Sequence, residues 1–194
     1  MRAGTLRQAR WHRHALAIGA PPALRSWLRE SGSLTARLTA ASTVFRVQRL
    51  HQHTALCLRD EAAAIGMRRP GRVWEREVLL RCDGEAVVFA HTVVPMSATA
   101  ADWPLFNALG ERSLGSTLFY DPRVVRGELE FARLRAGHPL MQRARAALGL
   151  DENTVLFARR CLYRRRRGTL LVTEVFLPSV LALAAPRHNT TNIK

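Results

Sequence analysis

The feature that most constrains this chain is the Asp83-Gly84 pair, which lies between two runs of strand-forming residues. These runs, residues 72–82 and 85–94, are rich in β-branched and aromatic side chains. Asp-Gly between two such runs is the signal for a type I′ turn, which needs a positive φ at both central residues. The sequence therefore predicts an antiparallel hairpin, and Pro95 ends its second strand.

The first strand of this hairpin carries a charge among apolar side chains. Because strand side chains alternate between two faces, one face is predicted to carry Trp74, Arg76, Val78 and Leu80. The other face carries Glu75, Glu77 and Leu79. Arg76 is thus an arginine in apolar surroundings.

A second apolar strand, Thr169 to Leu177, ends at Pro178. Glu174 lies in its middle and shares a face with Val172 and Phe176. Both faces are largely apolar, so the carboxylate is expected to be sheltered, and a sheltered carboxylate must be paired, hydrogen-bonded or partly protonated. A structural ion pair and a ligand-binding carboxylate both fit this pattern.

The remaining pattern predicts an α+β fold: a single antiparallel sheet of about six strands with helices on one face. Further strands are expected at residues 43–50, 126–134 and 153–164, and helices at 23–30, 34–41 and 138–149. Residues 95–109 read as a loop and a helix, and residues 110–120 as a turn leading into a short strand.

Length and composition predict one globular domain over residues 23–183. Residues 1–22 are expected to be a poorly ordered basic lead-in, and residues 184–194 a disordered tail. Three cysteines without a CxxC pair, Cys57, Cys82 and Cys161, indicate reduced packing residues in a cytoplasmic protein. No apolar run reaches the roughly 18 residues that a membrane span requires, so no stable membrane insertion is expected.

The formal net charge is +15, and arginine supplies nearly all of it. A basic surface can hold nucleic acid, attract an anionic small molecule or lie near anionic lipid, and charge alone does not choose among these partners.

Familiar catalytic motifs are missing from the sequence. It has no GxGxxG or GxxxxGK[ST] loop, no HExxH pair and no GxSxG elbow. His51 and His53 share a strand face, but no third ligand is evident, so no metal site is predicted. Arg76 and Glu174 remain, and together they suit a small anionic ligand with a polar group at its far end.

Four segments in register resemble the chorismate pyruvate-lyase family: Trp74–Glu85, His91–Pro95, Leu114-Gly115 and Leu171–Pro178. The resemblance runs from about Trp27 to Pro178. It implies a single antiparallel sheet with helical flaps over a buried site, and a monomer that needs no cofactor. The reaction it implies converts chorismate to 4-hydroxybenzoate and pyruvate, the first step of ubiquinone biosynthesis.

The resemblance also assigns roles to residues. Arg76 would clamp the ring carboxylate bidentately, which a lysine could not do. The main chain of Leu114 would complete that site, with Gly115 permitting close approach. Glu174 would face the hydroxyl end of the ring, either as a general base or only to orient the hydroxyl.

Two positions depart from the family pattern. Leu34, on the predicted flap over the ligand, replaces the more usual methionine and keeps an apolar lid. His91 stands where an arginine that helps guide the substrate is expected, and histidine would weaken that guidance at neutral pH.

Two other classes of function compete with a lyase. Effector domains of some bacterial repressors are similar in fold, but no helix-turn-helix is evident before the first predicted strand. A nucleic-acid-binding protein would explain the charge, but it would leave Arg76 and Glu174 without a purpose, and the basic segments lack interleaved aromatics.

Overall fold

The computed structural model describes residues 8–98, 102–104, 106, 108–118 and 121–183. The predicted disordered tail and the first seven residues of the predicted lead-in lie outside this part of the chain. From Gln8 onward the lead-in packs on the domain, because His12 pairs with Phe131 and the side chains of Ala15 and Ile18 are buried.

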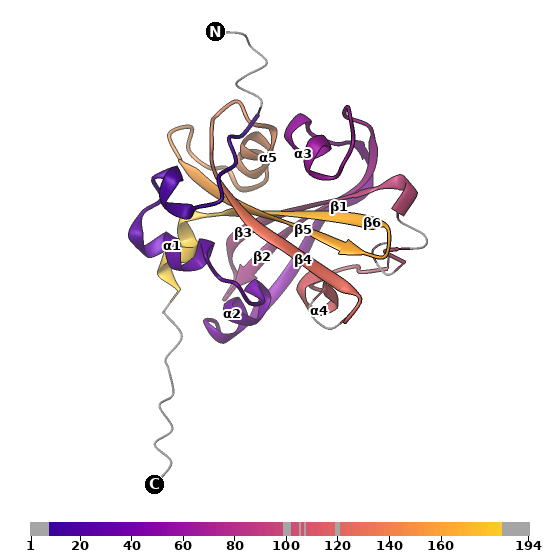
Figure 1. Ribbon diagram of the computed structural model, residues 1–194. Helices are drawn as coiled ribbons and strands as arrows, with labels where there is room; N and C mark the ends of the chain where they lie inside the picture. The colour runs from indigo at the N-terminus through magenta and orange to yellow at the C-terminus, as the bar shows by residue number, and fades with distance from the viewer. Residues whose placement is uncertain (1–7, 99–101, 105, 107, 119–120, 184–194) are drawn as a thin grey trace.

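Six strands form one sheet in which every neighbouring pair is antiparallel (Figure 1). They are β1 (Phe45–Leu56), β2 (Arg72–Cys82), β3 (Glu85–Pro95), β4 (Val124–Leu134), β5 (Leu156–Arg165) and β6 (Gly168–Phe176), and their order is β1-β2-β3-β6-β5-β4. The predicted single antiparallel sheet is confirmed. Its two central strands, β3 and β6, come from different hairpins.

The predicted hairpin of β2 and β3 forms, and β5 and β6 form a second hairpin. At the first turn Asp83 has φ 51° and Gly84 has φ 90°, the positive values that the Asp-Gly signal requires. The second turn contains Arg166 and Arg167 between β5 and β6, and Arg166 has φ 54°. The predicted alternation also holds, since Arg76, Val78 and Leu80 line one side of the sheet while Leu79 packs on the other.

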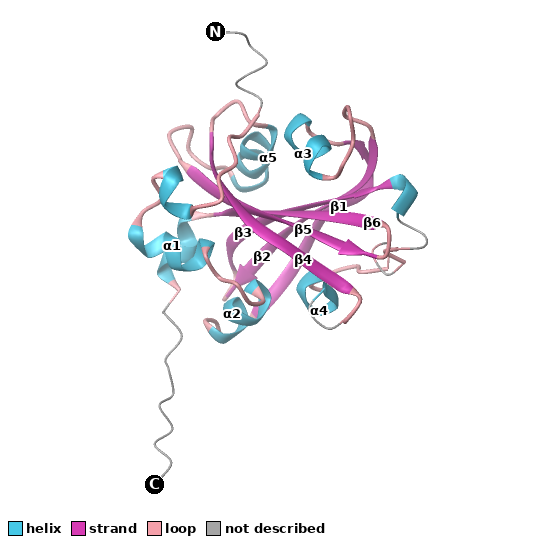
Figure 2. Ribbon diagram, in the orientation of Figure 1, coloured by secondary structure: helices cyan, strands magenta, loops and turns pink. Residues whose placement is uncertain are grey.

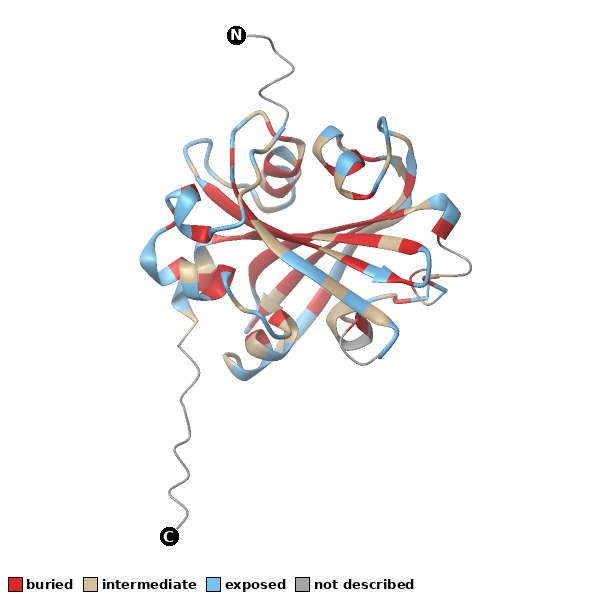
Figure 3. Cartoon of the chain, in the orientation of Figure 1, coloured by how far each residue is buried: buried red, intermediate tan, exposed pale blue. Residues whose placement is uncertain are grey.

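Helices cover both faces of the sheet, whereas the sequence pattern placed them on one (Figure 2). α1 (Pro22–Leu28), α2 (Leu34–Ala40) and α4 (Leu114–Leu118) lie on one face, and α3 (Arg59–Ala64) and α5 (Pro139–Leu148) on the other. The reason is that β3 is apolar on both sides: Val88 packs with α1 and α2, and Phe89 packs with α5. Figure 3 shows the resulting band of buried residues through the centre of the sheet.

The main difference from the predicted elements lies between β3 and β4. The short strand expected at residues 110–120 is instead the helix α4, which begins where the Ser113 hydroxyl accepts a hydrogen bond from the Gly115 amide (3.2 Å). The described residues of 102–109 form turns rather than the expected helix. Phe106 and Leu109 are nevertheless buried. The apolar residues of this segment therefore reflect packing against the core and not the period of a helix.

Helix ends follow local signals more closely. Ser33 caps α2, since its hydroxyl accepts a hydrogen bond from the Ala36 amide (3.2 Å). Gly149 ends α5 in the left-handed conformation, with φ 62°. None of the helices in the described ranges has the length and apolar character needed to cross a bilayer.

Candidate active site

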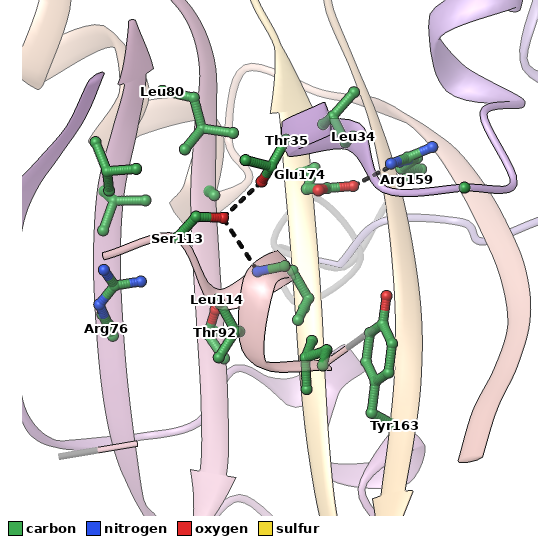
Figure 4. Close-up of a pocket in the computed structure, with 17 residues that line it drawn as sticks. Leu34, Thr35, Arg76, Leu80, Thr92, Ser113, Leu114, Arg159, Tyr163 and Glu174 are labelled. Atoms are coloured by element: carbon green, nitrogen blue, oxygen red, sulfur yellow. Dashed lines mark hydrogen bonds and ion pairs between the residues drawn. The ribbon is translucent and has the colours of Figure 1, made fainter. Parts of the chain in front are cut away.

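A cavity lies between the sheet and a roof formed by α2 and α4 (Figure 4). Its floor consists of side chains from β2, β3, β6 and β5, and its roof of residues around the starts of the two helices. The residues that line it include Leu34, Thr35, Arg76, Ala90, Thr92, Ser113, Leu114, Gly115, Arg159, Tyr163, Val172 and Glu174. The structure therefore brings together all four predicted site residues: Arg76, Glu174, Leu114 and Leu34.

Arg76 is a buried guanidinium that faces this cavity and is 2% exposed. Its Nη2 donates to the carbonyl oxygens of Gly110 and Arg112, both at 3.0 Å. Nε has no hydrogen-bond partner, and no carboxylate among the described residues pairs with the group. Burial, with a smaller contribution from Arg49, lowers the pKa of Arg76 to about 10. This buried cation is held by neutral carbonyl oxygens, and no carboxylate of the described residues compensates its charge.

Glu174 faces the same cavity from β6, and its side chain is 18% exposed. The Arg159 Nε donates to Glu174 Oε2 at 2.5 Å. The Arg159 Nη1 donates to main-chain carbonyls at the end of α1, of which Glu30 is the nearest at 2.7 Å. The ion pair expected for a sheltered carboxylate is therefore present. It lies at the wall of the cavity and uses only Oε2, so Arg159 does not contact the second carboxylate oxygen, Oε1.

The sheet register fixes the relation between the two charged groups. Arg76 pairs with Thr92, Thr92 pairs with Val172, and Glu174 lies two residues further along β6. Two strand spacings across and two residues along place the Cα atoms of Arg76 and Glu174 about 12 Å apart. Because both side chains extend into the cavity, this separation suits a six-membered ring with polar groups at opposite ends.

The roof is closed by a contact between its two helices. Thr35 Oγ1 and Ser113 Oγ are 2.6 Å apart and share a hydrogen bond. A Cβ atom on Gly115 would lie 2.9 Å from Thr35 Oγ1, so Gly115 is the residue that lets α4 approach α2. The close neighbour expected at Gly115 is therefore the other helix of the roof. Leu34 is buried beneath it, 3% exposed.

Sequence reasoning missed Arg159, although a signal was available. A two-residue turn at Arg166-Arg167 fixes the register of the hairpin and pairs Arg159 with Glu174. Tyr163 was missed as well; burial, together with Cys161 and Glu174, raises the pKa of its hydroxyl. Both residues lie on β5, a strand that was interpreted only as a structural element.

His91 does not belong to the site. It is fully buried on the opposite face of the sheet, where its Nδ1 lies 3.0 Å from Glu77 Oε1 and its Nε2 lies 2.8 Å from Glu61 Oε1. The expectation that this position guides substrate into the cavity is wrong for this chain, because the side chain points away from it. Burial opposes the charge, but the two carboxylates raise the pKa of His91 to about 10.

The same face holds the histidine pair that was noted in the sequence. The rings of His51 and His53 are stacked 4.4 Å apart, and Glu75 lies beside them as a third potential metal ligand that the sequence did not reveal. The Arg143 Nη1 already lies 2.9 Å from Glu75 and 2.6 Å from Glu77. This guanidinium supplies the positive charge that a metal ion would bring.

Curated relatives resemble this chain over most of its length. A probable chorismate pyruvate-lyase of Cupriavidus metallidurans is 48% identical over 183 residues, which cover 93% of this chain and 86% of the relative. A probable chorismate pyruvate-lyase of Ralstonia nicotianae is 50% identical over 163 residues, covering 82% and 84% of the two chains.

Solved structures with low sequence identity share the fold. The effector domain of PhnF from Mycobacterium smegmatis has a TM-score of 0.54 at 18% identity, and the match covers 76% of this chain and 90% of that domain. The C-terminal domain of the histidine utilization repressor from Pseudomonas syringae has a TM-score of 0.52 at 13% identity, covering 70% and 93%. The sequence profile of the chorismate lyase family matches residues 5–184, and with the curated relatives it shows that this chain belongs to that family.

Proposed function

We propose that this protein is a chorismate pyruvate-lyase that releases pyruvate from chorismate and forms 4-hydroxybenzoate for ubiquinone biosynthesis. The observation that carries the proposal is Arg76, a buried guanidinium in the cavity without an acidic partner among the described residues. The ring carboxylate of chorismate supplies the missing anion, and it accepts hydrogen bonds from the Nε and Nη1 donors of Arg76, because the Gly110 and Arg112 carbonyls occupy only Nη2.

The far end of the ring then lies at Glu174. Oε2 is held by Arg159, so Oε1 is the oxygen that meets the hydroxyl and the hydrogen at ring carbon C4. In the reaction the C3–O bond to the enolpyruvyl group breaks, and the C4 hydrogen leaves as a proton that is taken by Glu174 or by the departing group. The enolpyruvate released gains one proton at its methylene carbon and becomes pyruvate. The ring becomes aromatic, which provides a large driving force, so the protein needs mainly to position the substrate and to hold its charges.

Leu34 and Leu114 complete the site from above. The Leu34 side chain covers the ring from the start of α2, and the main chain of Leu114 lies at the carboxylate end. The Thr35–Ser113 hydrogen bond closes this roof, so α2 and α4 act as flaps that separate to release the aromatic product. No metal, nucleotide or nucleic acid takes part, and the protein works as a monomer.

We place the reaction in the cytoplasm. Cys57, Cys82 and Cys161 are all free and buried, which supports a reducing compartment.

The test is to mix the protein with chorismate, follow 4-hydroxybenzoate by its absorbance, and measure pyruvate separately. Stoichiometric formation of both products is expected. Because the fold is shared with repressor effector domains, the alternative outcome is a protein that binds chorismate or 4-hydroxybenzoate without turnover. Binding without pyruvate release would assign a sensor and overturn the proposal.

A further inference from the structure

One end of the sheet carries a concentration of exposed arginines that the lyase site does not use. At this end β1, β3 and β5 finish and β2, β4 and β6 begin (right-hand side of Figure 1). The exposed arginines belong to the loop before β2, the start of β2, the end of β5 and the β5–β6 turn. We call this surface the basic end, and its six arginines are Arg68, Arg69, Arg72, Arg164, Arg166 and Arg167.

These segments are adjacent in space as well as in topology. The Thr169 hydroxyl, next to the β5–β6 turn, donates to the Ile65 carbonyl at the end of α3 (3.4 Å). This contact places the turn beside the loop that carries Arg68 and Arg69. Five strand spacings of about 4.8 Å separate the two edge strands, so the basic end spans about 24 Å.

The positive charge of the basic end is not neutralised by the described residues around it. None of its six arginines forms an ion pair with a carboxylate in the described ranges. The nearby Asp121 is taken by two other arginines: it lies 3.0 Å from Arg123 and 2.8 Å from Arg165. The basic end therefore presents a field that attracts an anionic surface.

Exposed aliphatic side chains stand among these arginines. Leu56 is 66% exposed and is the register partner of Arg72, and Val125 is 65% exposed and is the register partner of Arg164. Met96, at the end of β3, is 41% exposed. Arginine mixed with exposed aliphatic groups matches the headgroup boundary of a bilayer, where charge meets phosphate and apolar side chains enter the acyl region.

From this arrangement we propose that the basic end is a docking surface for an anionic lipid bilayer, on which the protein lies without inserting a helix. Non-specific nucleic-acid binding would use the same charge, but it gains affinity from aromatic side chains that stack on bases. Within the described part of the basic end the exposed apolar groups are aliphatic, and the nearby Trp103, Phe106 and Tyr163 are buried. Lipid therefore fits the surface better.

The experiment is sedimentation of the full chain with vesicles of phosphatidylcholine alone or with about a third phosphatidylglycerol. Binding is expected only to the anionic vesicles and should weaken as salt is added. Each arginine near an anionic surface contributes about fivefold to partitioning, so removing four should weaken binding by roughly several hundredfold. The test variant combines Arg68→Gln, Arg69→Gln, Arg164→Gln and Arg167→Gln.

A matched control removes the same charge from the opposite end of the domain. It combines the exposed positions Arg10→Gln, Arg46→Gln, Arg133→Gln and Arg135→Gln. The control should lose far less vesicle binding than the test variant, and both should keep the lyase activity of the parent protein. Equal losses in the two variants would show that net charge acts without a defined surface, and would overturn the proposal.

A parallel measurement of binding to duplex RNA distinguishes a lipid surface from nucleic acid as the partner of the basic end. If the test variant lost duplex binding but sedimented with anionic vesicles as well as the parent, the basic end would be a nucleic-acid surface instead. Binding of the parent to phosphatidylcholine alone at the same level would also exclude the proposed electrostatic docking.

Discussion

The two faces of β2 hold buried charges in opposite ways. On the cavity face Arg76 contacts two carbonyl oxygens and no carboxylate of the described protein. On the other face Glu75 and Glu77 share the guanidinium of Arg143, and Glu77 also contacts His91. Adjacent residues of a single strand thus have a cation without a carboxylate partner on one side and a network of paired charges on the other.

This difference separates a binding site from a structural network better than burial does. A buried ion network whose members pair with one another gains little from a ligand, and its removal damages the fold. A buried cation beside a cavity remains incompletely paired until an anion enters. The variants below test this distinction.

The largest effect is expected from Glu174→Gln, which keeps the shape and one acceptor oxygen but cannot accept a proton. If Glu174 is the general base, the rate of a single turnover should fall by roughly 10²–10⁴ with product binding little changed. Single turnover is the required measurement, because slow product release would hide a defect in chemistry. A loss of about tenfold or less would indicate that Glu174 only orients the hydroxyl. An unchanged rate would remove it from the mechanism.

Arg76→Ala should weaken the binding of both chorismate and 4-hydroxybenzoate by about 2–5 kcal/mol, because a carboxylate in a dry site loses a charge-assisted partner. The fold should survive, since no buried carboxylate of the described protein depends on Arg76. Calorimetric titration with 4-hydroxybenzoate measures the loss. Product affinity equal to that of the parent protein would contradict the carboxylate assignment.

Arg143→Ala is the matched control on the opposite face. It leaves Glu75 and Glu77 without their guanidinium, and because the Arg143 side chain is 33% exposed, water compensates for part of the loss. A destabilisation of about 1–3 kcal/mol is expected, with product affinity unchanged. If this variant bound product as weakly as Arg76→Ala, the two faces would not be functionally distinct.

The paired network should also make stability depend on pH. Glu61 and Glu77 raise the pKa of His91 above its ordinary value of 6.5, to about 10. The contribution of protonated His91 to the free energy of unfolding is therefore complete below pH 6.5 and is lost as pH rises through about 10. The decline should not exceed about 1.4 kcal/mol per pH unit for one proton. Denaturant titrations between these limits should show this decline in the parent and a flatter profile in His91→Gln.

The smallest effect is expected at the roof. Leu34→Ala removes apolar cover from the start of α2, so the flaps should open more readily and product should leave a few-fold faster. Steady-state assays should then show weaker inhibition by 4-hydroxybenzoate. Tighter inhibition in this variant would contradict the role of α2 as a flap.

The parts of the fold that were predictable depend on local chemistry. Asp83-Gly84 determined the first hairpin, and alternation along β2 and β6 assigned Arg76 and Glu174 to their faces. The helix α4 was not predictable in this way, because it spans only Leu114–Leu118 and is held by contacts with α2. Propensity carries little weight in so short a helix.

The pairing of charges was less predictable than their burial. The sheltered position of Glu174 could be predicted from its own strand. To predict its partner Arg159, the register between β5 and β6 must also be known. The position of His91 was interpreted through family resemblance alone. In the sheet Ala90 pairs with Glu174 and His91 pairs with Thr173, so the His91 side chain lies on the face opposite to Glu174. A resemblance identifies a position in the chain, and only the register of the sheet shows which way its side chain points.

The seam between β3 and β6 has a consequence for how the domain holds together. Arg76 belongs to the hairpin of β2 and β3, Glu174 belongs to the hairpin of β5 and β6, and the two hairpins are joined in the sheet by the pairs from Val88–Phe176 to Val93–Leu171. In the proposed binding mode, a ring held at one end by Arg76 and at the other by Glu174 therefore bridges this seam. Its binding energy adds to the cohesion between two halves of the chain that are distant in sequence, so an occupied site resists separation of the hairpins.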